Sequence, residues 1–269
     1  MEKQTGKPKF KDEKFEQLIR VTLSKPEGEI TGEDMAKIEK LEGAAAFHIS
    51  DISGIEYCVN LKILNLCNGI DDDNRNFIKD ISGLKELKNL TEIDMSINNI
   101  DNIDALGGLI NLTKLWLSRN EIRDITPLGG LCNLKSLKLD SNPFCGVGAL
   151  SDLIDLTELW LGGNSKINDI NPLSNLVNLE AFMLFGNPIG DISVLSKFVN
   201  LTYLCLNADK IDDISPLGNL VNLKDLTLSA NEIKDITPLG GLINLNSLQI
   251  YSNQISDYSP VAHVKNLYL

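Results

Sequence analysis

The chain has 269 residues, and 43% of them are hydrophobic, which is enough to build a sizeable buried core. Its 37 acidic and 25 basic residues give a formal net charge of -12, which disfavours contact with the phosphates of nucleic acids and with anionic membranes. No run approaches the roughly 20 apolar residues that cross a bilayer, and the polar start at residues 1–10 is not a secretion signal. We therefore expect no membrane insertion and, because of the negative charge, no nucleic acid partner.

Two amphipathic helices are expected ahead of the first repeat. Apolar residues lie close to helical spacing over residues 15–23. A second helix is predicted to open at Thr31, an N-cap residue, and to carry its apolar positions on to Leu41. The polar outer faces of the two helices would shield the apolar end of the first coil, since an open solenoid end invites aggregation.

One sequence template recurs from Leu61 to the end of the chain. It reads L-x-x-L-x-L-x-x-N-x-I-x-D-I-x-P-L-x-x-L-x-N and has a period of 22 residues. The copies open at Leu61, Leu90, Leu112, Leu134, Leu156, Leu179, Leu201, Leu223 and Leu245. The first copy contains an insertion around residues 69–77, and the fifth contains one extra residue near Ser165. The alternation in L-x-L predicts a strand with one buried face, and stacked strands would bury the other apolar side chains of each copy.

The asparagine of the template predicts a stacked ladder of side-chain amides. Such an amide can donate to and accept from the backbone of neighbouring turns, which satisfies polar groups that would otherwise be buried without a partner. Gly69 replaces the asparagine in the first copy, and Asp209 replaces it once more. The asparagines of the predicted ladder are Asn98, Asn120, Asn142, Asn164, Asn187, Asn231 and Asn253.

Short helical turns are predicted on the side of each coil that lies opposite the strand. A capping residue follows the second isoleucine of the template, and five of these residues precede a proline. The predicted caps are Ser53, Ser82, Asp104, Thr126, Asn171, Ser193, Ser215, Thr237 and Ser259. The aspartate before that isoleucine, such as Asp124, is expected to accept backbone N–H groups rather than to bind calcium, because one oxygen per coil cannot supply the roughly six to eight ligands of that ion.

Together these patterns predict an α/β leucine-rich-repeat solenoid. We expect a right-handed coil with a parallel β-sheet on its concave face and short 3₁₀ or α-helical turns on its convex face. Residues 1–60 would form an α-helical N-terminal cap and its junction. Residues 61–269 would form about nine repeats with an uncapped C-terminus.

The repeats resemble those of the internalin family of bacterial leucine-rich-repeat proteins, which share the 22-residue period and the D-I-x-P-L signature at residues 124–128 and 235–239. Residues 41–68 are similar to the internalin junction between helical cap and first repeat. The resemblance implies a cell-surface or secreted protein of the adhesion or virulence type, which grips a host or cell-surface protein in its concavity. The secretion signal and the immunoglobulin-like cap of the family are not found, and we expect that the chain is trimmed rather than closed by self-association.

The concave face is where binding residues are expected, because the strand residues between the leucines do not enter the core. Both tryptophans of the chain fall in a single column of this face. Exposed aromatic side chains are enriched at the centres of protein interfaces, although packing of the rings across strands is the alternative interpretation. The predicted partner-binding residues are Trp116, Trp160, Met183, Phe185, Tyr203, Tyr251, Lys114, Lys138 and Glu158.

Catalysis, cofactors, metals and a small-molecule substrate are not expected. His48 and His263 are the two histidines, and neither has a nucleophile in a motif around it. The five cysteines follow no disulfide or metal spacing and are expected to be free thiols, most of them buried. The acidic residues 71–74 lack the glycine and the closing glutamate of a calcium loop and are interpreted as a solvated insertion.

Two other functions remain open at this point. The free thiols and the missing signal would suit an intracellular, cytoplasmic scaffold similar to the leucine-rich-repeat regulatory subunits of phosphatases. The chain could also be the targeting half of an enzyme such as a ligase effector. The cap region and the proline-containing turns favour the surface protein over both.

Overall fold

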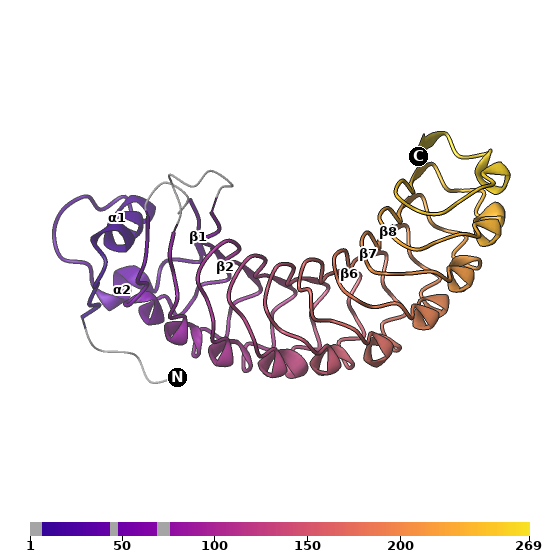
Figure 1. Ribbon diagram of the computed structural model, residues 1–269. Coiled ribbons are helices and arrows are strands. Elements are labelled where there is room, and N and C mark those ends of the chain that lie inside the picture. The colour runs from indigo at the N-terminus through magenta and orange to yellow at the C-terminus, as the bar shows by residue number, and fades with distance from the viewer. Residues whose placement is uncertain (1–6, 44–47, 69–75) are drawn as a thin grey trace. The chain divides into compact units, whose positions relative to one another are not determined.

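The structure is a computed structural model that describes residues 7–43, 48–68 and 76–269. The chain divides into two compact units, residues 1–134 and 135–269. In each unit, short parallel strands line one face and 3₁₀ helices line the opposite face (Figure 1). This arrangement confirms the predicted leucine-rich-repeat solenoid with a helical N-terminal cap.

The first unit begins with the cap and continues into parallel strands that pair in chain order. Its elements are α1 (Glu13–Thr22), α2 (Gly32–Met35), β1 (Lys40–Leu41), η2 (Ile55–Tyr57), β2 (Ile63–Asn65), η4 (Ser82–Leu84), β3 (Glu92–Asp94), η5 (Asp104–Leu106), β4 (Lys114–Trp116) and η6 (Thr126–Gly130). Strand β1 pairs with β2, β2 with β3 and β3 with β4. The cap therefore joins the repeats through a strand of its own.

The second unit consists of repeats, and the structure describes all of its residues. Its elements are β5 (Ser136–Lys138), η7 (Gly148–Leu150), β6 (Glu158–Trp160), η8 (Asn171–Leu173), β7 (Ala181–Met183), η9 (Ser193–Lys197), β8 (Tyr203–Cys205), η10 (Ser215–Leu217), β9 (Asp225–Thr227), η11 (Thr237–Gly241), β10 (Ser247–Gln249), η12 (Ser259–Val261) and β11 (Asn266–Tyr268). Consecutive strands pair in parallel without a register shift. The middle residue of each strand from β5 to β10 is buried, so the residues on either side of it face outward.

The cap helices form where the sequence predicts them, but the second one is shorter. Thr31 and Asp34 make a reciprocal capping box at the start of α2. The helix ends at Met35, and Leu41 lies in β1 instead, because pairing with β2 satisfies the backbone there. In α1, Phe15, Leu18 and Ile19 are buried, whereas Val21 is 63% exposed and lies outside the apolar face.

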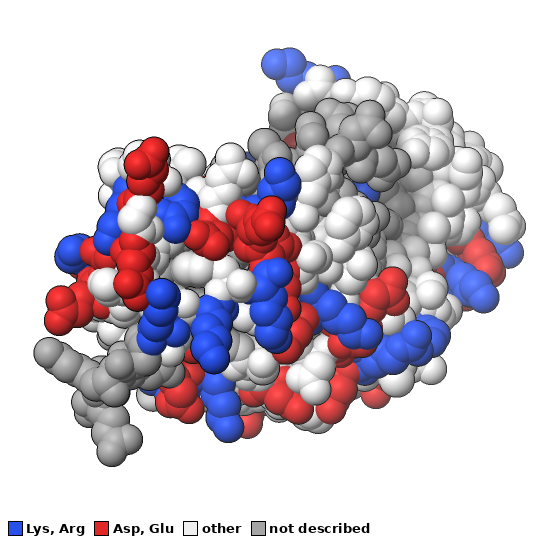
Figure 2. All heavy atoms as spheres, turned by 90° about the vertical axis from the view of Figure 1, so that its left-hand side faces the viewer, with Lys and Arg blue, Asp and Glu red and all other residues white. Residues whose placement is uncertain are grey.

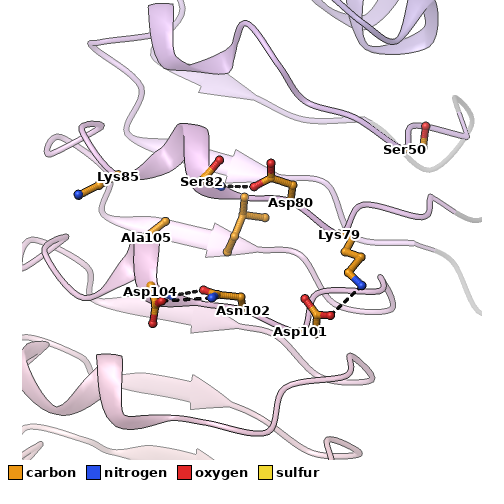
Figure 3. A pocket seen from close by; sticks show the side chains of 10 residues that line it. Ser50, Lys79, Asp80, Ser82, Lys85, Asp101, Asn102, Asp104 and Ala105 are labelled. Atoms are coloured by element: carbon orange, nitrogen blue, oxygen red, sulfur yellow. Dashed lines mark hydrogen bonds and ion pairs between the residues drawn. The ribbon is translucent and has the colours of Figure 1, made fainter.

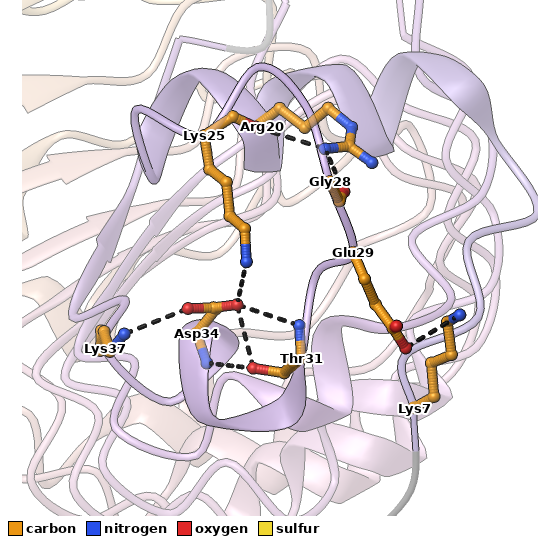
Figure 4. A network of polar contacts seen from close by, with 8 residues as sticks. All are labelled: Lys7, Arg20, Lys25, Gly28, Glu29, Thr31, Asp34 and Lys37. Atoms are coloured by element: carbon orange, nitrogen blue, oxygen red, sulfur yellow. Dashed lines mark hydrogen bonds and ion pairs between the residues drawn. The ribbon is translucent and has the colours of Figure 1, made fainter.

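Ion pairs and hydrogen bonds connect polar side chains of the cap (Figure 4). Lys25 and Lys37 donate to Asp34 over 2.7 and 3.1 Å, and the bond from Lys25 contributes most to holding the pKa of that carboxyl below its usual value. Arg20 donates to the carbonyl of Gly28 at 3.0 Å. Acidic and basic side chains are interspersed over the cap end of the molecule, which is the polar outer face expected of a solenoid cap (Figure 2).

The predicted asparagine ladder is present in both units. In the first unit, the Asn120 amide donates to the carbonyls of Met95 and Leu117 at 3.0 Å each, and its oxygen accepts the N–H of Ile100 at 2.9 Å. The prediction was wrong for the first copy, where Asn76 rather than Gly69 has this role: Asn76 is fully buried and accepts the N–H of Ile49 at 2.8 Å. The insertion therefore falls before the ladder position, and residues 69–75 lie outside the described part of the chain.

The turns opposite the strands are 3₁₀ helices, and their caps differ from the prediction. The Ser, Thr or Asn that was expected to cap is instead the first helical residue, and the N-cap position is an isoleucine, which has no side-chain cap bond. The N–H of the first helical residue donates to the aspartate two residues earlier, for example from Thr126 to Asp124 at 2.8 Å. These bonds lower the pKa of Asp124 and of Asp235, as expected for carboxylates that accept backbone N–H groups.

A second asparagine ladder runs along the exposed edge of the coils, at the last position of the template. Each amide donates to a carbonyl of the previous coil, as from Asn200 to Val177 at 3.0 Å and from Asn222 to Val199 at 2.9 Å. Asn89, Asn111 and Asn200 of the N-x-T triplets all donate in this way. Their amide nitrogens are thus already used within the fold.

In each coil from β3 to β10, one left-handed residue precedes the ladder position and allows the chain to leave the strand. Glycine has this conformation in two coils, at Gly163 (φ +68) and Gly186 (φ +73). Other residue types have it elsewhere, namely Ile97, Arg119, Ser141, Ala208, Ala230 and Ser252, with φ between 56 and 61. The backbone of the turn is therefore held by the ladder bonds rather than by the choice of residue.

Candidate protein-binding face

The outward strand residues of the second unit form a surface that we call the strand face, and Trp160 lies near its start. The Nζ atom of Lys138 on β5 lies 3.4 Å from the centroid of the Trp160 ring on β6. The same ammonium is 2.9 Å from a carboxylate oxygen of Glu158, whose other oxygen accepts the Ser136 hydroxyl at 2.5 Å. The side chain of Lys138 is only 12% exposed, so this pair is screened less than a surface ion pair.

A similar cluster occurs in the first unit around Trp116. There the Nζ of Lys114, on the same strand as the indole, lies 3.6 Å from the ring centroid. It is 3.9 Å from a carboxylate oxygen of Glu92 on the neighbouring strand β3. Each tryptophan is thus covered on one face by a lysine that is itself paired with a glutamate.

Aromatic and sulfur-containing residues follow Trp160 along the strand face. Met183, Phe185 and Tyr203 are all partly exposed, and Tyr251 is 47% exposed. The Phe185 ring lies directly on the backbone of Gly162, where a Cβ atom would come within 2.2 Å of it. A glycine just after β6 therefore leaves room for the ring of a residue just after β7.

The structure places the predicted binding residues on the outward side of strands, or directly after one, with less exposure than we expected. Trp116 and Trp160 are half-buried rather than open to solvent, because lysine side chains cover them. Within the described residues, the Nε1 atom of Trp160 is buried without a hydrogen-bond partner. The lysine cover was not predicted from the sequence, although each tryptophan has a Lys and a Glu at outward positions of its own strand or of the strand before it.

A row of exposed aliphatic side chains is a second surface that the sequence analysis did not identify. In the second unit it contains the residue just before the exposed ladder position in five successive coils, and that ladder position is asparagine in all but one of them. The members are Ile154, Val177, Val199, Val221 and Ile243, with exposures of 43 to 80%. The row lies off the strand face, and the hydrogen bonds of the exposed ladder hold its backbone.

A hollow on the first unit is lined by several polar side chains that already have partners (Figure 3). Asp101 pairs with Lys79 at 2.8 Å, and Asp80 accepts the N–H of Ser82 at 2.8 Å. Asn102 accepts the N–H of Asp104 at 2.8 Å. The acidic groups of this hollow are therefore already used in an ion pair or in the turns around it.

No group of three or more His, Cys, Asp or Glu residues that could hold a metal ion is found in the described part of the chain. Likewise, no helix among the described residues is long and apolar enough to span a membrane. All five cysteines are free, as predicted, but Cys132 and Cys145 are exposed, so the expectation that most are buried was wrong. Burial raises the pKa of Cys58 to about 12 and that of Cys67 to about 11, which keeps both thiols protonated at neutral pH.

Comparisons with known proteins agree with this geometry. The leucine-rich-repeat family model (2 copies) matches residues 110–153, 177–219 and 221–263. An internalin (inlF) from Listeria monocytogenes has 36% sequence identity and a TM-score of 0.90, over 97% of this chain and 76% of the other. Internalin C2 from the same species has 26% identity and a TM-score of 0.56, over 98% of this chain and 96% of the other.

A leucine-rich-repeat protein from Leptospira interrogans shares the fold, with 23% identity and a TM-score of 0.68 over 78% of this chain and 53% of the other. No curated protein matches the chain. The repeats, the ladders and these matches define a leucine-rich-repeat protein. Within that class, the chain belongs to the internalin family.

Proposed function

We propose that the chain is a non-catalytic recognition protein that binds another protein on the strand face of its second unit. The observation that carries the proposal is the series Trp160, Met183, Phe185 and Tyr203, which stay partly exposed on three adjacent coils. Large rings on a rigid sheet lose little conformational entropy on binding, and such residues dominate the energetics of protein interfaces. The predicted residue Tyr251 would extend this contact within the second unit, whereas Lys114 and Trp116 belong to the first unit.

The partner would be a host or cell-surface protein, and the chain would act at the cell surface or after secretion. Membership of the internalin family supports this part of the proposal, which concerns an adhesion or virulence role. The alternative is an intracellular scaffold, and the observation that favours it is that all five cysteines are free.

The partner can be identified with the immobilised chain. Biotinylated surface proteins and cytosol of mammalian cells would be passed over it separately, and retained proteins would be identified by mass spectrometry. Recovery of one partner from the surface fraction supports the adhesion proposal, whereas recovery from cytosol alone supports the scaffold.

The binding face is then tested with the purified partner. We expect Trp160→Ala to weaken binding about thirtyfold in Kd, as for an aromatic residue that dominates the energetics of an interface. Tyr258→Ala is the matched control, because Tyr258 is a partly exposed aromatic residue at the N-cap of η12, away from the strand face. Equal Kd values for the two variants would contradict the proposed face.

A further inference from the structure

Asp209 occupies the ladder position between β8 and β9, where other coils have asparagine. Its side chain is fully buried. One carboxyl oxygen accepts the N–H of Asn187 at 2.7 Å. The other oxygen is buried without a hydrogen-bond partner among the residues that the structure describes.

The neighbouring ladder residues show what this second oxygen lacks. The Asn231 amide donates to the carbonyls of Leu206 and Leu228, at 2.7 and 2.9 Å. The Asn187 amide donates to the carbonyls of Leu161 and Leu184. By the same repeat geometry, residue 209 faces the carbonyls of Leu184 and Leu206. An ionised carboxylate has no hydrogen to donate to them, and its charge would be repelled by their oxygens.

The surroundings of Asp209 supply no charge that would stabilise an anion. Asn187 and Asn231 pack against it from the two neighbouring turns, and neither titrates. The adjacent Lys210 is exposed. Burial raises the pKa of Asp209 from 3.8 to about 8, against the smaller opposing effect of the Asn187 N–H. Burial of an unpaired carboxyl in this way favours its neutral form.

The turn that contains Asp209 is also strained. Ala208 and Lys210, on either side of it, both have left-handed backbone conformations, with φ of 59° and 61°. Such conformations persist in residues other than glycine only where neighbouring bonds hold them. In this turn those bonds run to the neighbouring coils, including the one from the N–H of Asp209 to Asn231 at 3.0 Å.

We propose that Asp209 keeps a proton in the folded protein at neutral pH and donates it in a hydrogen bond to the carbonyl of Leu184 or Leu206. This hydrogen bond helps to hold the turn in its folded conformation. This proton replaces one of the two amide hydrogens that asparagine donates to such carbonyls in other coils. The turn therefore loosens as the pH rises. Because it follows directly on the strand of Tyr203 and Cys205, the loosening begins beside the strand face.

The sign of the effect follows from the two protonation states. Unfolded chain loses this proton near pH 3.9, whereas the folded protein retains it up to a pH of about 8. The stabilisation of the folded state by Asp209 is therefore fully present in acid and is lost as the pH rises. The equilibrium constant for unfolding should increase by up to about tenfold per pH unit within this window.

Asp209→Asn tests the proposal, since it restores the residue found elsewhere in the ladder. Urea unfolding would be measured from pH 4.5 to pH 9 for the wild type, for Asp209→Asn and for Asp212→Asn. Asp212 is exposed and three residues away, so its variant makes the same Asp-to-Asn replacement without the buried contact. We expect the wild type and Asp212→Asn to become less stable as the pH rises, and Asp209→Asn to lose this dependence.

The protonation state of the wild type gives a second measurement that does not depend on any variant. The carboxyl ¹³C resonance of Asp209 should stay at its protonated position up to pH 7. A resonance with a titration midpoint below pH 7 would overturn the proposal. So would an Asp209→Asn variant with the same pH dependence as Asp212→Asn.

Discussion

The ammonium group of Lys138 lies 3.4 Å from the centre of the Trp160 ring, on the adjacent strand, and also contacts Glu158. A cation above an indole is attracted by the negative face of the ring, and the glutamate holds the cation in place. This arrangement keeps the Trp160 side chain in one orientation before any partner arrives. A preorganised side chain loses less entropy on binding, which raises affinity without adding contacts.

Removing the cation should release the indole. In a Trp116→Phe background, where Trp160 is the remaining tryptophan, we expect Lys138→Met to shift tryptophan emission and to lower the free energy of unfolding by about 1 kcal/mol. Fluorescence and urea unfolding provide the two measurements. Lys135→Met removes an exposed lysine of the same coil as a control, and identical results from both variants would show that the Lys138 contact is unimportant.

Truncation of a core leucine should be costly. Leu117 is fully buried beside β4, and Leu117→Ala should lower the free energy of unfolding by about 2 to 5 kcal/mol because it leaves a cavity. Ile110→Ala, at a side chain that is 57% exposed, should change it by less than about 1 kcal/mol. Chemical denaturation measures both, and similar losses would contradict the stacked core.

The two asparagine ladders should differ in their contribution to stability. Asn231→Ala leaves the N–H groups of Asp209 and Ile211 and the carbonyl of Leu206 without their side-chain partner, so we expect a loss of at least about 2 kcal/mol. Asn222→Ala removes one exposed bond to Val199 and should cost below about 1 kcal/mol, because water can replace it. Thermal and urea unfolding would show the difference, and equal losses would refute it.

The cap should make the protein sensitive to acid. The pKa of Asp34 is lowered by Lys25 most strongly, with contributions from Thr31 and Lys37. Its folded pKa is depressed, so its stabilisation is present above the unfolded value of about 3.9 and is lost as the pH falls below it. Asp34→Asn should therefore flatten the acid side of a plot of unfolding midpoint against pH. Glu33→Gln, at an exposed acid of the same helix, should keep the wild-type slope.

The repeat period was sufficient to predict the strands and the main ladder, because each apolar offset has one place in a stacked coil. Leu115 and Leu159 lie at the centres of β4 and β6 as the template requires. The position of the insertion was not predictable, since sequence spacing alone does not show whether extra residues fall before or after the ladder position. Asn76 shows that here they fall before it.

The candidate face was predictable as a column but not in its contacts. Lys114 shares a strand with Trp116, whereas Lys138 lies on the strand before Trp160, so the same contact arises from two different sequence spacings. The template also does not show whether the aspartate or the serine two residues later caps the turn, because both residues lie at the start of the same turn. Contacts across strands depend on register and rotamer, which a single sequence does not encode in its spacing.

The left-handed residue before each ladder position has a consequence for how such proteins change over generations. Because the coils from β3 to β10 all leave their strands through the same backbone bend, a whole coil could be duplicated or deleted without a new type of turn. Gly186, Ala208 and Ala230 occupy this bend in three successive coils of the second unit, so the residue can vary while the bend is kept. Gain or loss of coils would then lengthen or shorten the array while each remaining coil keeps its own packing.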